Sequence, residues 1–131
     1  MQFKKKKIFE KIIKNGDYSL VYPVLSVFFK TNYEKKLSLK LVGTLVKKKN
    51  FKKSVHRNRI KRLLKASFIL NKSILDKYII NQNYYIILIY KAFYLPKFKD
   101  VNESIISIFN KKKSLLKQLT SIGPKNFNCK S

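Results

Sequence analysis

The chain has 131 residues, of which 31 are Lys or Arg and 6 are Asp or Glu, so its formal net charge at pH 7 is +25. Hydrophobic residues make up 45% of the sequence and include 10 Phe and 8 Tyr. This composition suffices for the core of one domain and excludes a disordered polycation, which would be poor in aromatic residues. A positive field of this strength concentrates polyanions, so nucleic acid is the first partner class to consider.

The sequence also argues against a membrane protein and a secreted protein. The longest largely apolar run, residues 20–29, has about half of the ~20 residues that a membrane-spanning helix needs. Lys4 to Lys7 are not followed by the apolar segment of a signal peptide. Cys129 is the only cysteine, which excludes an intrachain disulfide framework. We therefore expect a cytoplasmic protein with no membrane partner.

The first predicted element is a helix over residues 3–15. Phe9, Ile12 and Ile13 recur at helical spacing and form its apolar side. Gly16 is expected to end this helix as a C-cap. From periodicity alone, Phe9 is interpreted as a core residue.

Strand structure is predicted next, over residues 17–29 and 37–46, with a polar turn at 31–36 between the two regions. Pro23 suits the beginning of a strand, where a missing N–H does little harm. Both faces of the first region carry apolar side chains, so alternation does not decide which face is buried. In the second region, alternation predicts one face with Leu39, Leu41, Gly43 and Leu45 and the other with Lys40, Val42, Thr44 and Val46.

A basic helix is the most distinctive element of the chain. Ser54 is expected to cap its N-terminus, and no Gly or Pro interrupts the sequence from there to about Phe68. Spacings of three and four residues place its apolar residues on one stripe, namely Ile60, Leu63, Leu64 and Phe68. Its polar face holds Asn58, Lys61, Arg62 and Lys65, with Arg57 and Arg59 on the two flanks.

The polar face of this helix has no acidic neighbours, because residues 50–75 contain no Asp or Glu. A solvated helix face usually mixes charges of both signs and gains from pairs of opposite charge, whereas like charges at this spacing repel each other. Arginine adds a planar fork that suits two-point contacts with phosphate. The pattern therefore favours nucleic-acid contact over a merely solvated helix face.

The C-terminal half predicts one more strand and one more helix. A polar stretch over 71–83 precedes residues 84–90, which are all apolar or aromatic and predict a short strand buried on both faces. Asp100 or Asn102 is expected to cap a last helix that ends at about Leu119. Four lysines of this helix suit its dipole and are interpreted as solvated, namely Lys111, Lys112, Lys113 and Lys117.

The run Arg57-Asn58-Arg59-Ile60-Lys61-Arg62-Leu63-Leu64 resembles the RNR signature of the bacterial ribonuclease P protein subunit family. The resemblance implies an α+β fold: a single-domain α/β sandwich with a small mixed four-stranded sheet and the element order α-β-β-β-α-β-α. It also implies a left-handed β-α-β crossover at the RNR helix, against the usual right-handed rule. We expect this domain over residues 1–121 and a disordered tail over 122–131.

The resemblance implies two RNA-binding surfaces. The first is basic, contacts the RNA subunit of ribonuclease P, and consists of Arg57, Asn58, Arg59, Lys61, Arg62, Lys65, Lys47, Lys48, Lys49, Lys52 and Lys53. The second is a cleft between the central helix and the sheet that takes the 5′ leader of precursor tRNA, edged by Phe9, Ile13, Val24, Ser26 and Phe28. Base stacking and phosphate contacts suit such a cleft, because a leader site accepts many sequences.

The chain lacks the groups of a protein catalyst. Its six acidic residues are spread among predicted helix ends and loops, and His56 and Cys129 are the only residues of their kinds. No catalytic site, metal site, protein-bound cofactor or small-molecule substrate is therefore expected. The resemblance implies that the RNA subunit holds Mg²⁺ and cleaves, so that this chain is the non-catalytic protein component of an endoribonuclease in tRNA 5′ maturation.

Two alternatives stay open at this point. A general basic RNA-binding or ribosome-associated protein would have the same charge without any role in cleavage. A cationic protein of the membrane surface would need a separable amphipathic helix, whereas these helices have strands to pack against.

Overall fold

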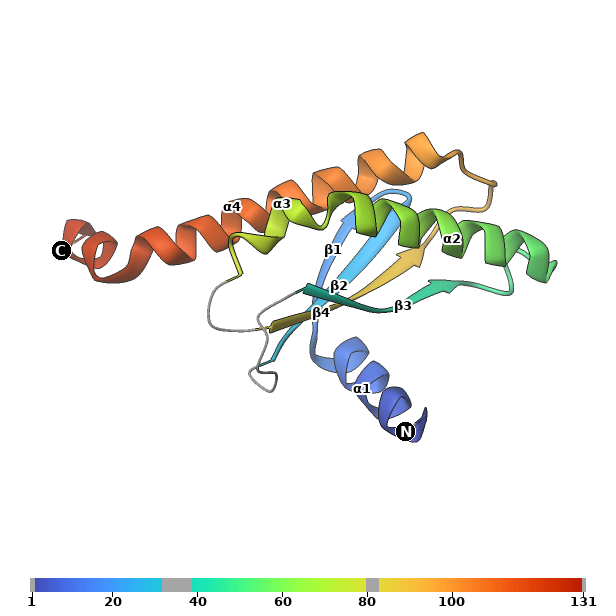
Figure 1. Ribbon diagram of the computed structural model, residues 1–131, viewed down its shortest axis with the longest axis horizontal. Helices are drawn as coiled ribbons and strands as arrows, with labels where there is room; N and C mark the ends of the chain where they lie inside the picture. Colours follow the sequence, from blue (N-terminus) through green and yellow to red (C-terminus); the bar gives the residue numbers. More distant parts are fainter. Residues whose placement is uncertain (1, 32–38, 80–82, 131) are drawn as a thin grey trace.

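The computed structural model describes residues 2–31, 39–79 and 83–130, and the side chains of 7–31, 39–79 and 83–118. The elements follow the predicted order, with one short extra helix after the basic helix (Figure 1). They are α1 (Gln2–Asn15), β1 (Asp17–Val21), β2 (Val24–Thr31), β3 (Leu39–Val46), α2 (Ser54–Asn71), α3 (Ser73–Asp76), β4 (Asn83–Tyr90) and α4 (Phe98–Lys130).

The four strands form one mixed sheet in the order β1-β2-β4-β3. β1 pairs with β2 and β2 with β4 in antiparallel fashion, whereas β3 and β4 are parallel neighbours. Because α2 lies between β3 and β4 in the sequence, the predicted β-α-β unit around the basic helix is confirmed. The left-handed sense of its crossover stays a prediction.

A two-residue turn divides the region that was predicted as strand over 17–29. Val21 faces Val24 in the register of β1 and β2, and Tyr22 and Pro23 lie between them with a cis peptide bond. Pro23 therefore belongs to the turn before β2 rather than to the beginning of a strand. Its carbonyl oxygen accepts the amide of Lys91 at 2.8 Å, which joins this hairpin to the loop after β4.

Helices cover the two faces of the sheet unequally (Figure 1). α2 packs on β3, α4 packs on β1 and β2, and the two helices also contact each other. α1 lies on the opposite face, against β2 and β4. We call these the two-helix face and the α1 face. The larger core lies on the two-helix face, where Leu64, Tyr90 and Phe109 are fully buried.

A β-bulge in β3 makes the predicted alternation of that strand wrong. The register against β4 shifts between Leu41 and Gly43, so Val42 is an extra residue. As a result Leu41 packs toward the two-helix face, whereas Leu45 packs toward the α1 face. Thr44 comes to lie beside α2.

Gly16 ends α1 for a steric reason. Its amide donates to the carbonyl oxygen of Ile12 at 2.7 Å. A Cβ at this position would lie 2.5 Å from Cγ1 of Val27 and 2.6 Å from the same carbonyl oxygen. Its φ angle is not positive, so the left-handed conformation of the predicted C-cap is absent. The chain instead turns into β1 so close to the sheet that only glycine fits.

The last helix differs from its prediction at both ends. α4 begins at Phe98, and its backbone is helical as far as Lys130, so the predicted end near Leu119 is wrong. A carboxylate oxygen of Asp100 accepts the amide of Lys97 at 3.1 Å, as in a capping box. The division of the chain at residue 121 stays a prediction. Residues 32–36 of the predicted turn lie outside the described residues, as do 80–82.

Candidate nucleic-acid interface

The basic helix α2 is amphipathic, as predicted. Ile60 and Leu64 are fully buried and Phe68 is nearly so, because they pack into the core of the two-helix face. The predicted polar residues are exposed or partly exposed, namely Asn58, Arg59, Lys61, Arg62 and Lys65. Burial of the apolar stripe fixes the rotation of the helix about its axis, so these side chains keep a constant orientation toward solvent.

Four residues of this face line one shallow depression together with a residue of the sheet. The depression has a volume of about 360 Å³ and is lined by Thr44 of β3 and by Asn58, Lys61, Arg62 and Lys65 of α2. Three cations around an open hollow suit phosphate oxygens, and the amide and hydroxyl add neutral hydrogen-bonding groups. Sequence reasoning missed Thr44, because its position depends on a bulge that the strand pattern does not signal.

At the start of α2, the structure contradicts the predicted N-cap and adds a second role for Arg57. Lys53, not Ser54, occupies the N-cap position, and no side chain caps the helix there. Arg57 instead donates from Nη1 to the carbonyl oxygens of Phe51 at 2.7 Å and of Lys52 at 3.0 Å. The guanidinium group that was predicted to contact RNA thus also holds the preceding loop against the first turn of the helix.

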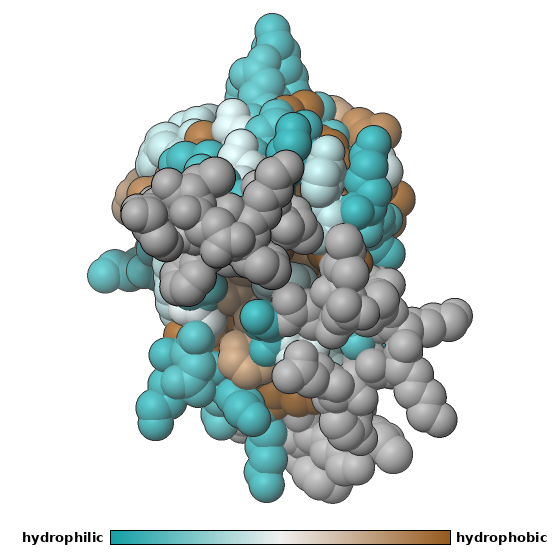
Figure 2. Space-filling model, turned by 90° about the vertical axis from the view of Figure 1, so that its left-hand side faces the viewer, coloured by the Kyte–Doolittle hydropathy of each residue, from teal (hydrophilic) through white to brown (hydrophobic). Residues whose placement is uncertain are grey.

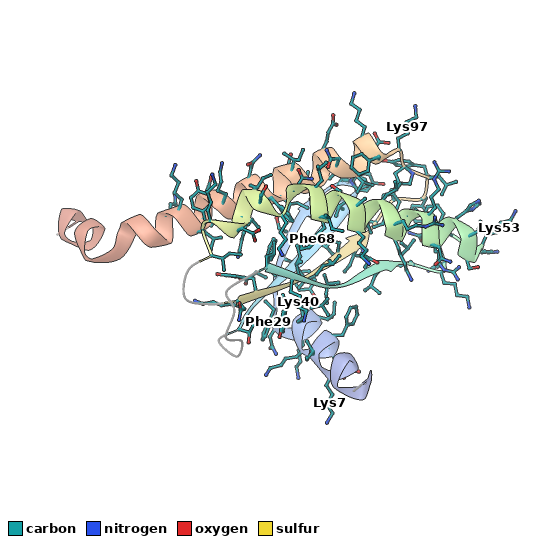
Figure 3. All side chains as sticks on the ribbon, in the orientation of Figure 1. Lys7, Phe29, Lys40, Lys53, Phe68 and Lys97 are labelled. Atoms are coloured by element: carbon teal, nitrogen blue, oxygen red, sulfur yellow. The ribbon has the colours of Figure 1, made fainter. Side chains whose placement is uncertain are left out.

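This loop, residues 47–53, presents its lysines to solvent around one buried aromatic residue. Phe51 is buried and its ring lies 6.1 Å from that of Tyr90. Asn50 donates to the carbonyl oxygen of Ala92 at 3.4 Å, and its amide closes a turn on Lys47 at 3.0 Å. The exposed side chains are Lys47, Lys48, Lys49, Lys52 and Lys53. Figure 3 shows Lys53 at the outer end of α2, so the loop and the α2 face adjoin.

The structure does not bring the five predicted cleft residues together. Phe9 and Ile13 lie on the α1 face. Val24, Ser26 and Phe28 point to the two-helix face, where two of them are fully buried and Phe28 is 2% exposed. Because these three residues lie on the opposite face of the sheet from Phe9 and Ile13, assigning all five to one cleft was wrong. Neighbouring residues of a strand point to opposite faces, so residues 24, 26 and 28 share one face of β2. That face is the two-helix face.

The α1 face carries a different set of residues beside Phe9 and Ile13. They are partly buried rather than enclosed, and they are Leu25, Phe29, Val42, Leu45 and Tyr85. Gly43 allows Phe9 to lie close, because a Cβ on this glycine would be 2.9 Å from Cε1 of the ring. The missing side chain of Gly43 is thus what makes room for the ring.

Basic side chains accompany this apolar surface. Lys11 of α1 lies with its Nζ 6.0 Å from the ring centroid of Phe29. Lys40 faces Tyr85 in the register of β3 and β4 and is exposed. Figure 3 labels Phe29 and Lys40 on the side of the sheet where α1 lies. Proteins that bind single-stranded nucleic acids combine aromatic rings, on which bases stack, with cations that contact the phosphates.

Two of the acidic residues lie near the start of α4. Asp100 and Glu103 of α4 line one hollow with Tyr22 and Tyr94. Among the side chains of residues 7–31, 39–79 and 83–118, no three of His, Cys, Asp or Glu are placed to hold a metal ion. A search of the same residues for a helix long and apolar enough to cross a membrane finds none.

Comparison with known families identifies the chain. The family model described as Ribonuclease P matches residues 1–113. The chain belongs to the ribonuclease P protein family. A search of curated protein sequences gives no match. Family membership supports a role in tRNA processing with RNA as a partner, and the predicted family resemblance is confirmed.

Solved structures support the same fold. The ribonuclease P protein from Thermotoga maritima matches with a TM-score of 0.64 and 23% identity, over 81% of this chain and 92% of that chain. The Staphylococcus aureus protein matches with a TM-score of 0.63 and 22% identity, over 82% of this chain and 90% of that chain. At these identities the two structures show a similar fold, and the predicted mixed α+β architecture is confirmed.

Proposed function

We propose that this chain is the protein subunit of a cytoplasmic ribonuclease P ribonucleoprotein and assists removal of 5′ leaders from precursor tRNAs. Membership of the family supports the association with ribonuclease P. The family resemblance implies that the RNA subunit holds the catalytic Mg²⁺. The residues of this chain then bind and position RNA, and no step of the cleavage is assigned to them.

The observation that carries the proposal is the basic depression between α2 and β3. Lys61, Arg62 and Lys65 surround it, and the RNR helix is held in place by its buried stripe and by the Arg57 contacts to the preceding loop. Because the helix backbone is fixed, the three cations are already gathered on one side before RNA binds, which lowers the cost of ordering them against phosphates. This surface and the exposed lysines of the loop over 47–53 would contact the RNA subunit.

The leader would bind on the α1 face rather than in the cleft predicted from the sequence. Phe29, Tyr85 and Phe9 give aromatic rings that are partly exposed, and Lys11 and Lys40 lie near them for phosphate contacts. Stacking on such rings contributes about 1–3 kcal/mol per base and tolerates any sequence. That tolerance fits a ligand whose sequence differs from one precursor to the next.

The test is cleavage of a precursor tRNA by the cognate RNA subunit at low Mg²⁺, with and without this protein. We expect cleavage at the mature 5′ end only when the protein is added. Arg62→Ala should weaken the stimulation, whereas Lys97→Ala, which removes an exposed cation elsewhere on the molecule (Figure 3), should leave it unchanged. The absence of stimulation, together with equal affinity for precursor and mature tRNA, would support a general RNA-binding protein instead.

A further inference from the structure

The loop between β4 and α4, residues 91–97, exposes three successive large apolar side chains. Phe93 is 74% exposed, Tyr94 48% and Leu95 43%. At the opposite end of the molecule, which Figure 2 shows, hydrophobic atoms lie gathered between hydrophilic side chains. Single exposed apolar residues are common on protein surfaces, whereas neighbouring ones form a patch of the kind that contacts a partner.

Hydrogen bonds hold this loop in one conformation. The amide of Lys91 donates to the carbonyl oxygen of Pro23 at 2.8 Å. The hydroxyl of Tyr90 donates to the carbonyl oxygen of Tyr94 at 2.8 Å. These bonds lie on both sides of Phe93 in the sequence, so the backbone that carries the exposed ring is fixed before any partner binds. A fixed backbone lowers the cost of ordering the loop on binding.

The β4–α4 loop adjoins the lysine-rich loop over 47–53. Ala92 is fully buried, and its carbonyl oxygen accepts the side-chain amide of Asn50 at 3.4 Å. Figure 1 shows both loops at the right-hand end of the molecule. Phe93 follows Ala92 directly, so its backbone lies next to the basic loop.

The charge at this end of the molecule is strongly positive. Residues 47–53 and 91–103 together hold eight lysines and two acidic residues. The five lysines of the first segment are exposed, and so are Lys97 and Lys99. An exposed aromatic ring bordered by cations suits RNA, whose bases stack on the ring while its phosphates contact the cations. A protein partner fits less well, because lysine is depleted in protein–protein interfaces.

The acidic residues of this end accompany Tyr94 rather than Phe93. Asp100 and Glu103 line a hollow together with Tyr94, and Phe93 does not line it. The ring of Tyr94 also packs edge-on against that of Tyr90, with 6.2 Å between the ring centroids. Carboxylates repel phosphate, so we assign the RNA contact to Phe93 alone.

We propose that Phe93 stacks on one unpaired base of the RNA partner, while lysines of the loop over 47–53 contact the phosphates beside that base. The inference takes from the proposed function only that the partner is RNA. Phosphate contacts form on paired and unpaired RNA alike. The ring of Phe93 would therefore direct the basic surface to a position where a base is unpaired.

The first test uses tryptophan fluorescence, because the chain contains no tryptophan of its own. The full chain with Phe93→Trp is titrated with the cognate RNA subunit and, separately, with inorganic polyphosphate, which carries charge but no bases. The RNA should quench the fluorescence through stacking, and polyphosphate should not. Leu115→Trp is the matched control, since Leu115 is 55% exposed and lies about 25 Å along α4 from its start. Its fluorescence should change with neither probe.

The second test is the affinity for the RNA subunit. Phe93→Ala should weaken binding about fivefold or more, the loss expected for one stacked base. The slope of log K against log salt should stay that of the wild type, because no cation is removed. Phe93→Leu should lose nearly as much affinity as Phe93→Ala, since leucine is apolar but not flat, whereas Phe93→Tyr should keep it.

Three results would overturn the proposal. Quenching by polyphosphate as strong as that by RNA would show that the ring responds to charge alone. Equal quenching at positions 93 and 115 would indicate a general effect of RNA on the chain. Wild-type affinity in Phe93→Leu would remove the stacking contact and would point to a protein partner for this loop.

The cleavage assay separates this inference from the proposed function. If the wild-type chain stimulates cleavage but RNA does not quench the Phe93→Trp variant, the inference alone is wrong. If RNA quenches this variant but the wild-type chain does not stimulate cleavage, the proposed function is wrong and the stacking contact remains.

Discussion

The two faces of the sheet are built from alternate residues of the same strands, yet they differ in how fully they are covered. On the two-helix face α2 and α4 lie side by side, and Phe28 of β2 is 2% exposed. On the α1 face one helix packs against β2 and β4, and Phe29, the next residue of β2, is only partly buried. The first face holds the larger core, whereas the second leaves apolar surface partly exposed.

This difference identifies which apolar residues can serve a function. An apolar surface that the fold leaves partly open marks an interaction site more often than a packing defect. The cations Lys11 and Lys40 lie beside the open surface, so its ligand is expected to be both aromatic and anionic. The following variants compare pairs of residues that are similar in type but lie in different surroundings.

The largest effect is expected from the two neighbouring phenylalanines of β2. Phe28→Ala should lower the free energy of unfolding by about 3–5 kcal/mol, because it leaves a cavity in a closed core. Phe29→Ala should cost clearly less, because its ring is already partly in contact with water. Urea unfolding of the two variants measures the difference, and equal losses would contradict the contrast between the faces.

The two glycines that lie close to side chains give the next comparison. Gly16→Ala should cost about 1–3 kcal/mol of stability, because its Cβ would meet a backbone carbonyl that cannot move aside. Gly43→Ala should cost less, since its Cβ would meet the Phe9 ring, which can rotate away. Thermal unfolding measures both. A larger loss at Gly43 would show that Phe9 is held more firmly than an open face allows.

Two of the three arginines of the RNR helix, Arg57 and Arg62, give the last comparison. Arg57→Ala should lower stability by about 1.5–3 kcal/mol at most, because it removes charge-assisted bonds to Phe51 and Lys52. Arg62→Ala should leave unfolding unchanged and should reduce the slope of log K against log salt by about 0.7–0.9, the value of one phosphate contact. An unchanged slope would remove Arg62 from the RNA interface.

The elements that depend on local pattern were predictable from the sequence. The buried stripe of α2, its polar face and the strand over 84–90 follow from periodicity, and Ile60 and Leu64 are fully buried as that pattern requires. The family resemblance added the β-α-β crossover around the RNR helix, and β3 and β4 on its two sides are parallel neighbours. Of the six predicted RNA-binding residues on α2, four line one depression, namely Asn58, Lys61, Arg62 and Lys65.

The remaining features depend on contacts between elements that are distant in the sequence. The faces of β2 could not be assigned, because both Phe28 and Phe29 are apolar and only the number of covering helices distinguishes them. The bulge at Val42 has no signal in the strand pattern, and it decides where Thr44 lies. Lys112 resembles its neighbours in the sequence, and only the rings of Phe28 and Tyr84 set it apart.

The most direct test of the central claim is the affinity of the reconstituted ribonucleoprotein for precursor tRNA relative to mature tRNA. The wild-type protein should give a clear preference for the precursor, because only the precursor has a leader for the α1 face. Phe29→Ala should remove much of this preference, whereas Arg62→Ala should weaken assembly with the RNA subunit and keep the preference. A preference that Phe29→Ala leaves intact would contradict the assignment of the leader to the α1 face.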